Sequence, residues 1–266
     1  MSDTYEIYAI QYGHHDRKAY ENFLGGDFHD DSDMPLAYFV WAIVGRDNSF
    51  ILDTGFGPDM AQKRGRRIVR PVAEGLKAIG LDPAEVGNVI LSHMHYDHAG
   101  NIPLFANARF HVQDAEMAYV TGRSMCHAAI RNPFEAEHVV HMVHRVFDGR
   151  VRFHDGVSEL APGVTLHKVG GHTKGLQVVR VKTRRGWVVL ASDAAHLYAN
   201  LARNHPFPIV VDVDAYLEAF ATIRGLASSE AQIVPGHDPL VLERYPLAKA
   251  GLAGIVRLDA EPSGCG

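Results

Sequence analysis

Three histidines and one aspartate lie within six residues, directly after a short apolar segment. The stretch reads Ser-His93-Met-His95-Tyr-Asp97-His98-Ala-Gly, and it follows the strand-like residues 88–91. His93 and His95 are two residues apart, so in extended backbone their side chains point the same way. Asp97 and His98 follow where the chain turns, and we expect them to serve a second ion beside the first. Imidazole and carboxylate ligands without thiolates suit Zn²⁺, with Mn²⁺, Fe²⁺ or Co²⁺ as alternatives.

Three later residues of ligand type each follow an apolar segment and have small neighbours. His172 lies in GGHTKG, Asp193 in LASDA and His237 in PGHD. Small neighbours let the backbone approach an ion closely. Each residue alone would more often be a surface or capping residue. Together with the first cluster, they predict the remaining ligands of a two-ion site.

Apolar runs rich in β-branched and aromatic residues predict strands, and apolar residues at helical spacing predict helices. We expect strands at 5–12, 37–44 (starting one residue earlier), 50–53, 88–91, 108–113, 151–154, 164–169, 176–182, 187–191 and 231–234. Helices are expected at 71–80, over most of 114–147 and at 214–227. Strands in both halves with helices between them suggest two packed sheets covered by helices.

Composition excludes several classes of protein. The 26 Lys and Arg against 31 Asp and Glu give a net charge of −5, which makes nucleic acid an improbable partner. No apolar run approaches the ~18 residues of a membrane span, and the first residues do not resemble a secretory signal. The two cysteines, Cys126 and Cys265, are too few for a disulfide framework. A cytoplasmic protein is therefore expected.

The order of these motifs resembles the metallo-β-lactamase superfamily. HxHxDH, GGHTKG, a strand-terminal Asp and PGHD follow one another, and Asp53-Thr54-Gly55 is similar to an early motif of that family. The resemblance covers about residues 37–240. It implies an α+β fold, an αββα sandwich of two mixed β-sheets flanked by helices, with the metals in a groove at one edge. It also implies that the first ion is held by His93, His95 and His172, the second by Asp97, His98 and His237, and both by a bridging Asp193. Asp53 is usually structural in this family and would tie the ligand loop through hydrogen bonds.

We expect one hydrolase domain over residues 1–266, with an insert at 114–150 that walls the substrate groove. The insert carries a set of large apolar residues that is either core or groove lining: Met117, Tyr119, Met125, Ile130 and Phe134. The polar and acidic segment 14–34 is either a surface loop or a flap over the substrate site.

Within the superfamily, the chain is most similar to the N-acyl homoserine lactonase group. Those enzymes share its length, the HxHxDHAG loop, the bridging aspartate and the PGHD motif. Secreted β-lactamases often have cysteine where Asp193 stands, and glyoxalase II-type thioesterases add a C-terminal helical domain. Neither feature is present in this sequence.

The resemblance predicts a dinuclear metal-dependent hydrolase that opens a lactone ring of N-acyl homoserine lactone type. A metal-bridging hydroxide would attack the carbonyl, and Asp97 would carry the proton to the leaving alkoxide. The partner is then a small lactone or ester, and a homodimer is left open. Alternatives are another ester, thioester or cyclic-ester hydrolase of a catabolic pathway, a mononuclear iron persulfide dioxygenase, or a metal-binding module without activity.

One position departs from the lactonases that this chain resembles. They place a tyrosine three residues after the bridging aspartate, where this chain has His196, and here the tyrosine, Tyr198, comes two residues later. We expect His196 or Tyr198 to donate a hydrogen bond to the developing oxyanion. A helix after Asp193 would favour His196 as the donor, whereas a loop would leave Tyr198 as an alternative donor. The alternative is that His196 only caps or packs.

Overall fold

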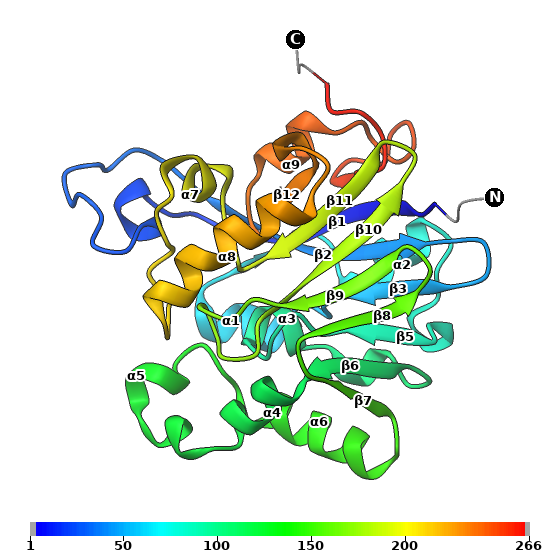
Figure 1. Ribbon diagram of the computed structural model, residues 1–266, viewed down its shortest axis with the longest axis horizontal. Coiled ribbons are helices and arrows are strands. Elements are labelled where there is room, and N and C mark those ends of the chain that lie inside the picture. The colour runs from blue at the N-terminus through cyan, green and yellow to red at the C-terminus, as the bar shows by residue number, and fades with distance from the viewer. Residues whose placement is uncertain (1–3, 264–266) are drawn as a thin grey trace.

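Two β-sheets face each other, and helices cover their outer faces (Figure 1). The computed structural model describes residues 4–263. The fold is an α+β sandwich of two mixed sheets, as expected. Among the described residues, no helix is long and apolar enough to cross a membrane.

The larger sheet has eight strands in the order β13-β1-β2-β3-β5-β6-β7, with β4 paired to β1. Antiparallel pairs join β13, β1, β2 and β3, whereas β3, β5, β6 and β7 are parallel. The strands are β1 (Glu6–His15), β2 (Leu36–Val44), β3 (Ser49–Leu52), β4 (Arg67–Ile68), β5 (Asn88–Ile90), β6 (Arg109–Gln113), β7 (Val151–His154) and β13 (Ile255–Arg257).

The smaller sheet has five strands in the order β12-β11-β10-β9-β8. Only β12 and β11 are parallel in it. The strands are β8 (Val157–Ala161), β9 (Val164–Lys168), β10 (Gln177–Thr183), β11 (Gly186–Ser192) and β12 (Ile233–Pro235).

The core has three layers because β2 and its neighbours are buried on both faces. Eight of the nine residues of β2 are buried. Phe39 and Trp41 pack between the sheets, while Tyr38 and Val40 point to the helices outside. A third layer lies between the five-stranded sheet and the helix α8.

The segment 114–147 is mostly helical, as expected. It forms three helices, with breaks at Gly122 and Pro133, residues that disfavour a continuing helix. Sequence patterns did not predict β8, β13, α1, α7 or α9. The helices are α1 (Pro58–Arg64), α2 (Val72–Ala78), α3 (Tyr96–Ala99), α4 (Asp114–Val120), α5 (Ala128–Arg131), α6 (Ala136–Phe147), α7 (Tyr198–Arg203), α8 (Val213–Leu226) and α9 (Leu240–Arg244), besides 3₁₀ turns at 19–22, 83–85, 102–104, 123–126 and 230–232.

Candidate metal centre

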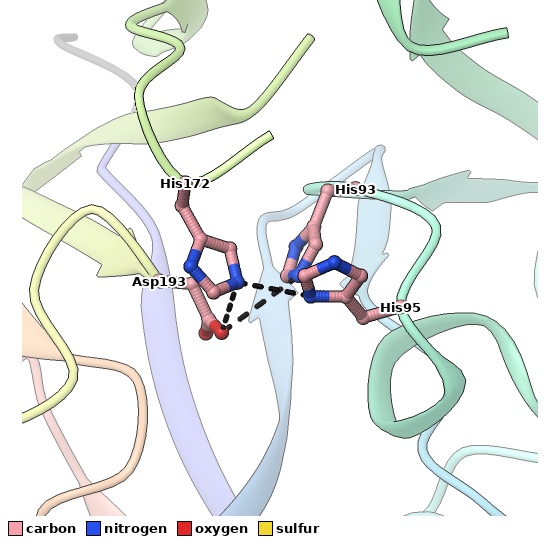
Figure 2. A group of neighbouring side chains, drawn as sticks. All are labelled: His93, His95, His172 and Asp193. Atoms are coloured by element: carbon pink, nitrogen blue, oxygen red, sulfur yellow. Dashed lines mark hydrogen bonds and ion pairs between the residues drawn. The ribbon is translucent and has the colours of Figure 1, made fainter. Parts of the chain in front are cut away.

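The predicted ligands come from loops of both sheets. His93 and His95 lie in the loop after β5, and Asp97 and His98 lie in the short helix α3 that follows. His172 lies between β9 and β10, Asp193 directly follows β11, and His237 follows β12. Figure 2 shows His93, His95, His172 and Asp193 pointing toward one another. The cluster therefore joins the eight-stranded sheet to the five-stranded one.

Five imidazole nitrogens surround the buried carboxylate of Asp193. Its Oδ2 lies 3.0 Å from His172 Nε2, 3.0 Å from His196 Nε2 and 3.7 Å from His93 Nε2. Its Oδ1 lies 3.0 Å from His237 Nε2 and 3.3 Å from His98 Nε2. All of these side chains are at most 3% exposed.

The other ring nitrogen of these histidines is held by the surrounding chain. His172 Nδ1 donates to the carbonyl of Ile209 at 2.6 Å, and His237 Nδ1 to that of Ala37 at 3.1 Å. A carbonyl oxygen only accepts, so the proton is on Nδ1 and Nε2 presents a lone pair to the cluster. The same anchoring is typical of histidines that bind metals.

Two buried ring nitrogens bear on whether the cluster can hold a cation. His93 Nε2 and His98 Nε2 have no hydrogen-bond partner in residues 4–263. Buried polar atoms are rarely left unpaired, and lone pairs around a carboxylate repel one another. A divalent cation would satisfy both groups at once, so the residues present fit a metal site.

The side chains form two groups that could each hold an ion, and Asp193 also joins a third. In each group, the potential ligand atoms lie within 4.8 Å of one another. The groups are His93, His95, His172 and Asp193; Asp97, His98 and His237; and Asp193, His196 and His237. The structure thus brings all seven predicted ligands together. That they bind metal stays a prediction.

The environment sets the charge of several ligands. Burial holds the pKa of His93 and of His95 well below the usual range, so both rings are neutral at pH 7. Burial alone would raise the pKa of Asp193, but the surrounding imidazoles, His196 foremost, hold it well below the usual range. Neutral imidazole and charged carboxylate are the forms that bind metal.

Asp53 supports the ligand loop, as the resemblance implies. Its Oδ1 accepts from Ser92 N at 2.7 Å, and its Oδ2 accepts from Ser92 Oγ at 2.8 Å and from His98 Nδ1 at 2.7 Å. Asp53 has φ +64°, a left-handed conformation that is uncommon outside glycine. The three hydrogen bonds offset this local strain and fix the orientation of His98.

The structure separates the two residues predicted to act on the oxyanion. Residues 193–197 form turns, and α7 begins only at Tyr198. Even so, His196 lies in the cluster, where its ring stacks on Phe207 with centroids 3.7 Å apart. Tyr198 lies elsewhere, with its ring 3.8 Å from the guanidinium of Arg244, and it lines a different pocket.

The hydrogen bonds of His196 argue against the predicted donor role. Tyr216 Oη donates to the carbonyl of Asp193 at 2.8 Å, so its oxygen can only accept from His196 Nδ1 at 3.1 Å. The proton of the neutral ring is then on Nδ1, and Nε2 presents a lone pair to Asp193. Burial lowers the pKa of His196 to about 3, so the ring does not gain a second proton at pH 7. His196 therefore has the form of a metal ligand rather than of a hydrogen-bond donor.

Sequence reasoning missed Glu116, a buried carboxylate of α4. Its Oε1 accepts from Met94 N at 2.8 Å, and its Oε2 accepts from Thr173 Oγ1 at 2.7 Å and Gly175 N at 3.0 Å. Glu116 thus joins the loop of His93 and His95 to the loop of His172. No motif marks it, because its partners are main-chain groups and a hydroxyl far away in the sequence.

A cleft and a cavity both adjoin the cluster. One is the cleft that opens onto Asp97, Asp193, His196 and His237. The other is a mostly apolar cavity of about 280 Å³ that shares His95 and His172 with the cleft. Its lining includes Tyr119, Ile130 and Phe134 of the 114–150 segment together with Ile209 and Val211. Met117 and Met125 instead contribute to the core.

Comparison with known proteins agrees with this arrangement. The chain is 29% identical over 166 residues to the N-acyl homoserine lactonase AiiA of Bacillus thuringiensis subsp. kurstaki, which covers 61% of this chain and 60% of the relative. It thus matches only about 60% of the length of the Bacillus relatives. It is 28% identical over 228 residues to the N-acyl homoserine lactonase AiiB of Agrobacterium fabrum, covering 77% of this chain and 80% of that protein.

Solved structures support the same fold. The crystal structure of a quorum-quenching N-acyl homoserine lactone lactonase superposes with a TM-score of 0.73 at 22% identity, covering 90% of this chain and 94% of that one. The family model of the metallo-beta-lactamase superfamily matches residues 33–237, which include every residue of the two predicted ligand groups. The chain therefore belongs to the metallo-beta-lactamase superfamily.

Proposed function

We propose that this protein is a metal-dependent hydrolase that opens a lactone ring of N-acyl homoserine lactone type. The observation that carries the proposal is the convergence of two ligand groups on one buried carboxylate, Asp193. The similarity to lactonases over most of the chain supports the choice of substrate. Two divalent ions are the cofactor we propose, with Zn²⁺ as the first choice for imidazole and carboxylate ligands.

Bound divalent ions would polarise the substrate carbonyl and lower the pKa of a water molecule toward neutrality. The chain itself must then move a proton. Asp97 is placed for this, since its side chain is 12% exposed and lines the cleft, with Oδ2 3.7 Å from His98 Nε2 and 3.9 Å from His237 Nε2. Its carboxylate can take the proton of the attacking water and pass it to the ring oxygen when the C–O bond breaks.

We propose that the acyl chain of such a substrate lies in the apolar cavity. Tyr119, Ile130 and Phe134 belong to the 114–150 segment, and we propose that this segment walls the substrate groove. A volume of about 280 Å³ accommodates a short alkyl chain beside His95 and His172. Burying that chain contributes roughly 0.8 kcal/mol for each methylene group.

A second candidate is the hydrolysis of another ester or thioester at the same site. The observation that favours it is the charged lining of the cleft, which includes Arg17, Arg64 and Arg66. A neutral homoserine lactone has no charged group to pair with such side chains. A mononuclear iron dioxygenase is less consistent with the site, because two separate ligand groups are present.

A substrate panel on zinc- and cobalt-loaded protein tests the proposal. The panel holds N-hexanoyl homoserine lactone, an unsubstituted γ-lactone, a linear ester and a thioester, and metal content is measured on the same samples. We expect about two ions per chain and the highest kcat/KM on a lactone. One iron per chain with sulfur-dependent oxygen uptake would contradict it, as would turnover of the thioester alone.

A further inference from the structure

Three arginine side chains line the cleft at the candidate metal centre, and two of them form no ion pair with the described residues. Arg17 comes from the segment after β1, and Arg64 and Arg66 come from the end of α1 and just beyond it. Arg64 pairs with Glu135 at 2.5 Å. In residues 4–263, no carboxylate lies within 4.0 Å of the guanidinium groups of Arg17 and Arg66. Surface arginines are common, but these two are half-buried beside the candidate site.

Neutral hydrogen bonds fix Arg66 in place. Its Nε donates to Tyr96 Oη at 3.1 Å and its Nη1 donates to the carbonyl of Arg64 at 2.6 Å. Tyr96 Oη lies 3.3 Å from Tyr38 Oη, and the ring of Tyr38 packs against that of His237 with centroids 5.1 Å apart. Nη2 of Arg66 has no hydrogen-bond partner in the described part of the chain. Arg66 is therefore held in one orientation next to the second ligand group, and its Nη2 can donate hydrogen bonds to a ligand.

Arg17 lines the same cleft. Its Nε donates to Asn22 Oδ1 at 2.8 Å, and its Nη2 bonds to the carbonyl of Glu21. The guanidinium lies 5.2 Å from the ring centroid of Phe207, the ring that stacks on His196. Its Nη1 has no partner between residues 4 and 263. Like Arg66, it is held by neutral groups and keeps one donor free.

The two positive charges are close enough to act on the same neighbour. The pKa of His15 is lowered to about 4, by burial first and then by the positive charges of Arg66 and Arg17. His15 is therefore neutral at pH 7 and does not balance the charge of the two guanidinium groups. Asp97 and Asp193 are the nearest acids of the cleft, and in the proposed function they serve the metal ions. Two fixed guanidinium groups that form no ion pair with a carboxylate are typical of a site for an anion.

We propose that Arg17 and Arg66 form a subsite for a non-reacting anionic group of the substrate, a carboxylate or a phosphate. The preferred substrate is then an anionic lactone or ester, whose carbonyl lies at the metal centre and whose anion lies between the two arginines. This inference rests on the proposed function for the reaction but not for the binding of the anion. It also gives a role to the segment 14–34, which supplies Arg17 as part of the cleft wall.

Three γ-lactones with one ring and different substituents test the substrate class. The probes are 5-oxotetrahydrofuran-2-carboxylate, the corresponding carboxamide, and the ring with a phosphorylated hydroxymethyl group. We expect zinc-loaded wild-type protein to prefer at least one anion over the carboxamide by about tenfold in kcat/KM, mostly through KM. The better anion identifies carboxylate or phosphate as the source. Equal or better turnover of the carboxamide would overturn the proposal and leave lactone hydrolysis standing.

Variants separate recognition of the anion from support of the fold. Arg17→Gln and Arg66→Gln should each remove most of the preference while turnover of the carboxamide stays within about twofold. Arg46→Gln is the matched control, because Arg46 is exposed in the turn beyond the far end of β2 and should keep the preference. A purely structural role would lower the turnover of all three lactones equally, and that result would contradict the subsite.

Binding provides a readout that does not depend on turnover. Tetrahydrofuran-2-carboxylate has no reactive carbonyl, so its affinity for zinc-loaded protein can be measured by calorimetry. We expect about tenfold weaker binding in the Arg17→Gln and Arg66→Gln proteins than in wild type and Arg46→Gln. Equal affinity in all four proteins would overturn the subsite. If no lactone is hydrolysed but this difference is found, the anion site stands and the proposed reaction fails.

Discussion

At the scale of single residues, the position of Asp193 determines what the site can bind. Its two oxygens face different sets of imidazoles, His172 and His196 on one side and His237 and His98 on the other. A carboxylate with each oxygen turned to a different ligand group can join two cations and screen their repulsion. A terminal ligand such as His237 does neither.

Replacing Asp193 should therefore have a larger effect than replacing a histidine. We expect Asp193→Ala to lose both ions on dialysis, and His237→Ala to keep close to one. Metal content per chain, measured together with circular dichroism to verify folding, checks this. A folded Asp193→Ala protein that keeps two ions would show that the carboxylate does not bridge them.

Asp97 allows a test of proton transfer apart from binding. Asn has the same shape and keeps one oxygen but cannot accept a proton at pH 7. We expect Asp97→Asn to lower kcat by about 10²-fold or more, with little change in KM at equal metal loading. An unchanged kcat in a fully loaded variant would exclude the proton-carrying role.

His196 and Tyr198 make a matched pair, since the first lies in the cluster and the second does not. The lone pair of His196 Nε2 faces Asp193 Oδ2 at 3.0 Å, so we expect His196→Ala to bind the metals at least tenfold more weakly. Tyr198→Phe should keep metal content and kcat near wild type. Competition with a chromogenic chelator measures the affinities. Retained affinity with a large fall in kcat for His196→Ala would instead support the donor role expected from the sequence.

At the scale of elements, the side chain of Glu116 joins α4 to the loop of His172. Glu116 accepts hydrogen bonds from two main-chain N–H groups and one hydroxyl. The contact is close: a Cβ at Gly175 would lie 2.2 Å from Glu116 N, so only glycine fits there. Burial raises the pKa of Glu116, although its three hydrogen bonds oppose this. Movement of α4 would thus displace both loops of the first ligand group.

Glu116→Gln tests this connection. The amide places an NH₂ group against a donor, so at least one buried partner loses its acceptor. We expect a loss of about 1–3 kcal/mol in the free energy of unfolding, together with weaker metal binding. Urea denaturation of the variant and of Glu74→Gln, an exposed position on α2, measures the difference. Equal stability of the two variants would exclude a supporting role for Glu116.

The sequence predicted which side chains the structure brings together where chemistry and local pattern coincide. The seven ligand-type residues follow short apolar runs, and the structure places each run in a strand at one edge of the sandwich. Arg66, Arg17 and Glu116 could not be found in this way. Arg66 and Glu116 have partners far away in the sequence, such as Tyr96, 30 residues from Arg66, and no periodicity or spacing records such pairs. Arg17 is recognised only by its place in the cleft. Helix over most of 114–147 was predicted correctly, but the breaks at Gly122 and Pro133 were not, because helical periodicity continues across them.

At the scale of the whole molecule, the candidate metal centre connects the two sheets. The loop after β5 belongs to the eight-stranded sheet, whereas Asp193 and His237 follow strands of the five-stranded sheet. Apolar packing joins the sheets along their length, with Trp41, Leu166 and Leu190 among the buried residues. At the edge that holds the site, polar groups replace this core. Bound ions would supply the missing attraction between the sheets there.

Removing the metal should therefore lower the stability of the entire fold rather than of one loop. Binding of an ion at about 1,000 times its Kd contributes about 4 kcal/mol, and for a chain of this size 1 kcal/mol corresponds to roughly 2–4 °C in Tm. We expect a chelator to lower the Tm of zinc-loaded protein by about 10 °C or more, and added zinc to restore it. Asp193→Ala should melt at the same temperature with or without chelator, because it holds no ion to lose. Scanning calorimetry measures both proteins, and a wild-type Tm unaffected by complete removal of the metal would show that apolar packing alone holds the sheets together.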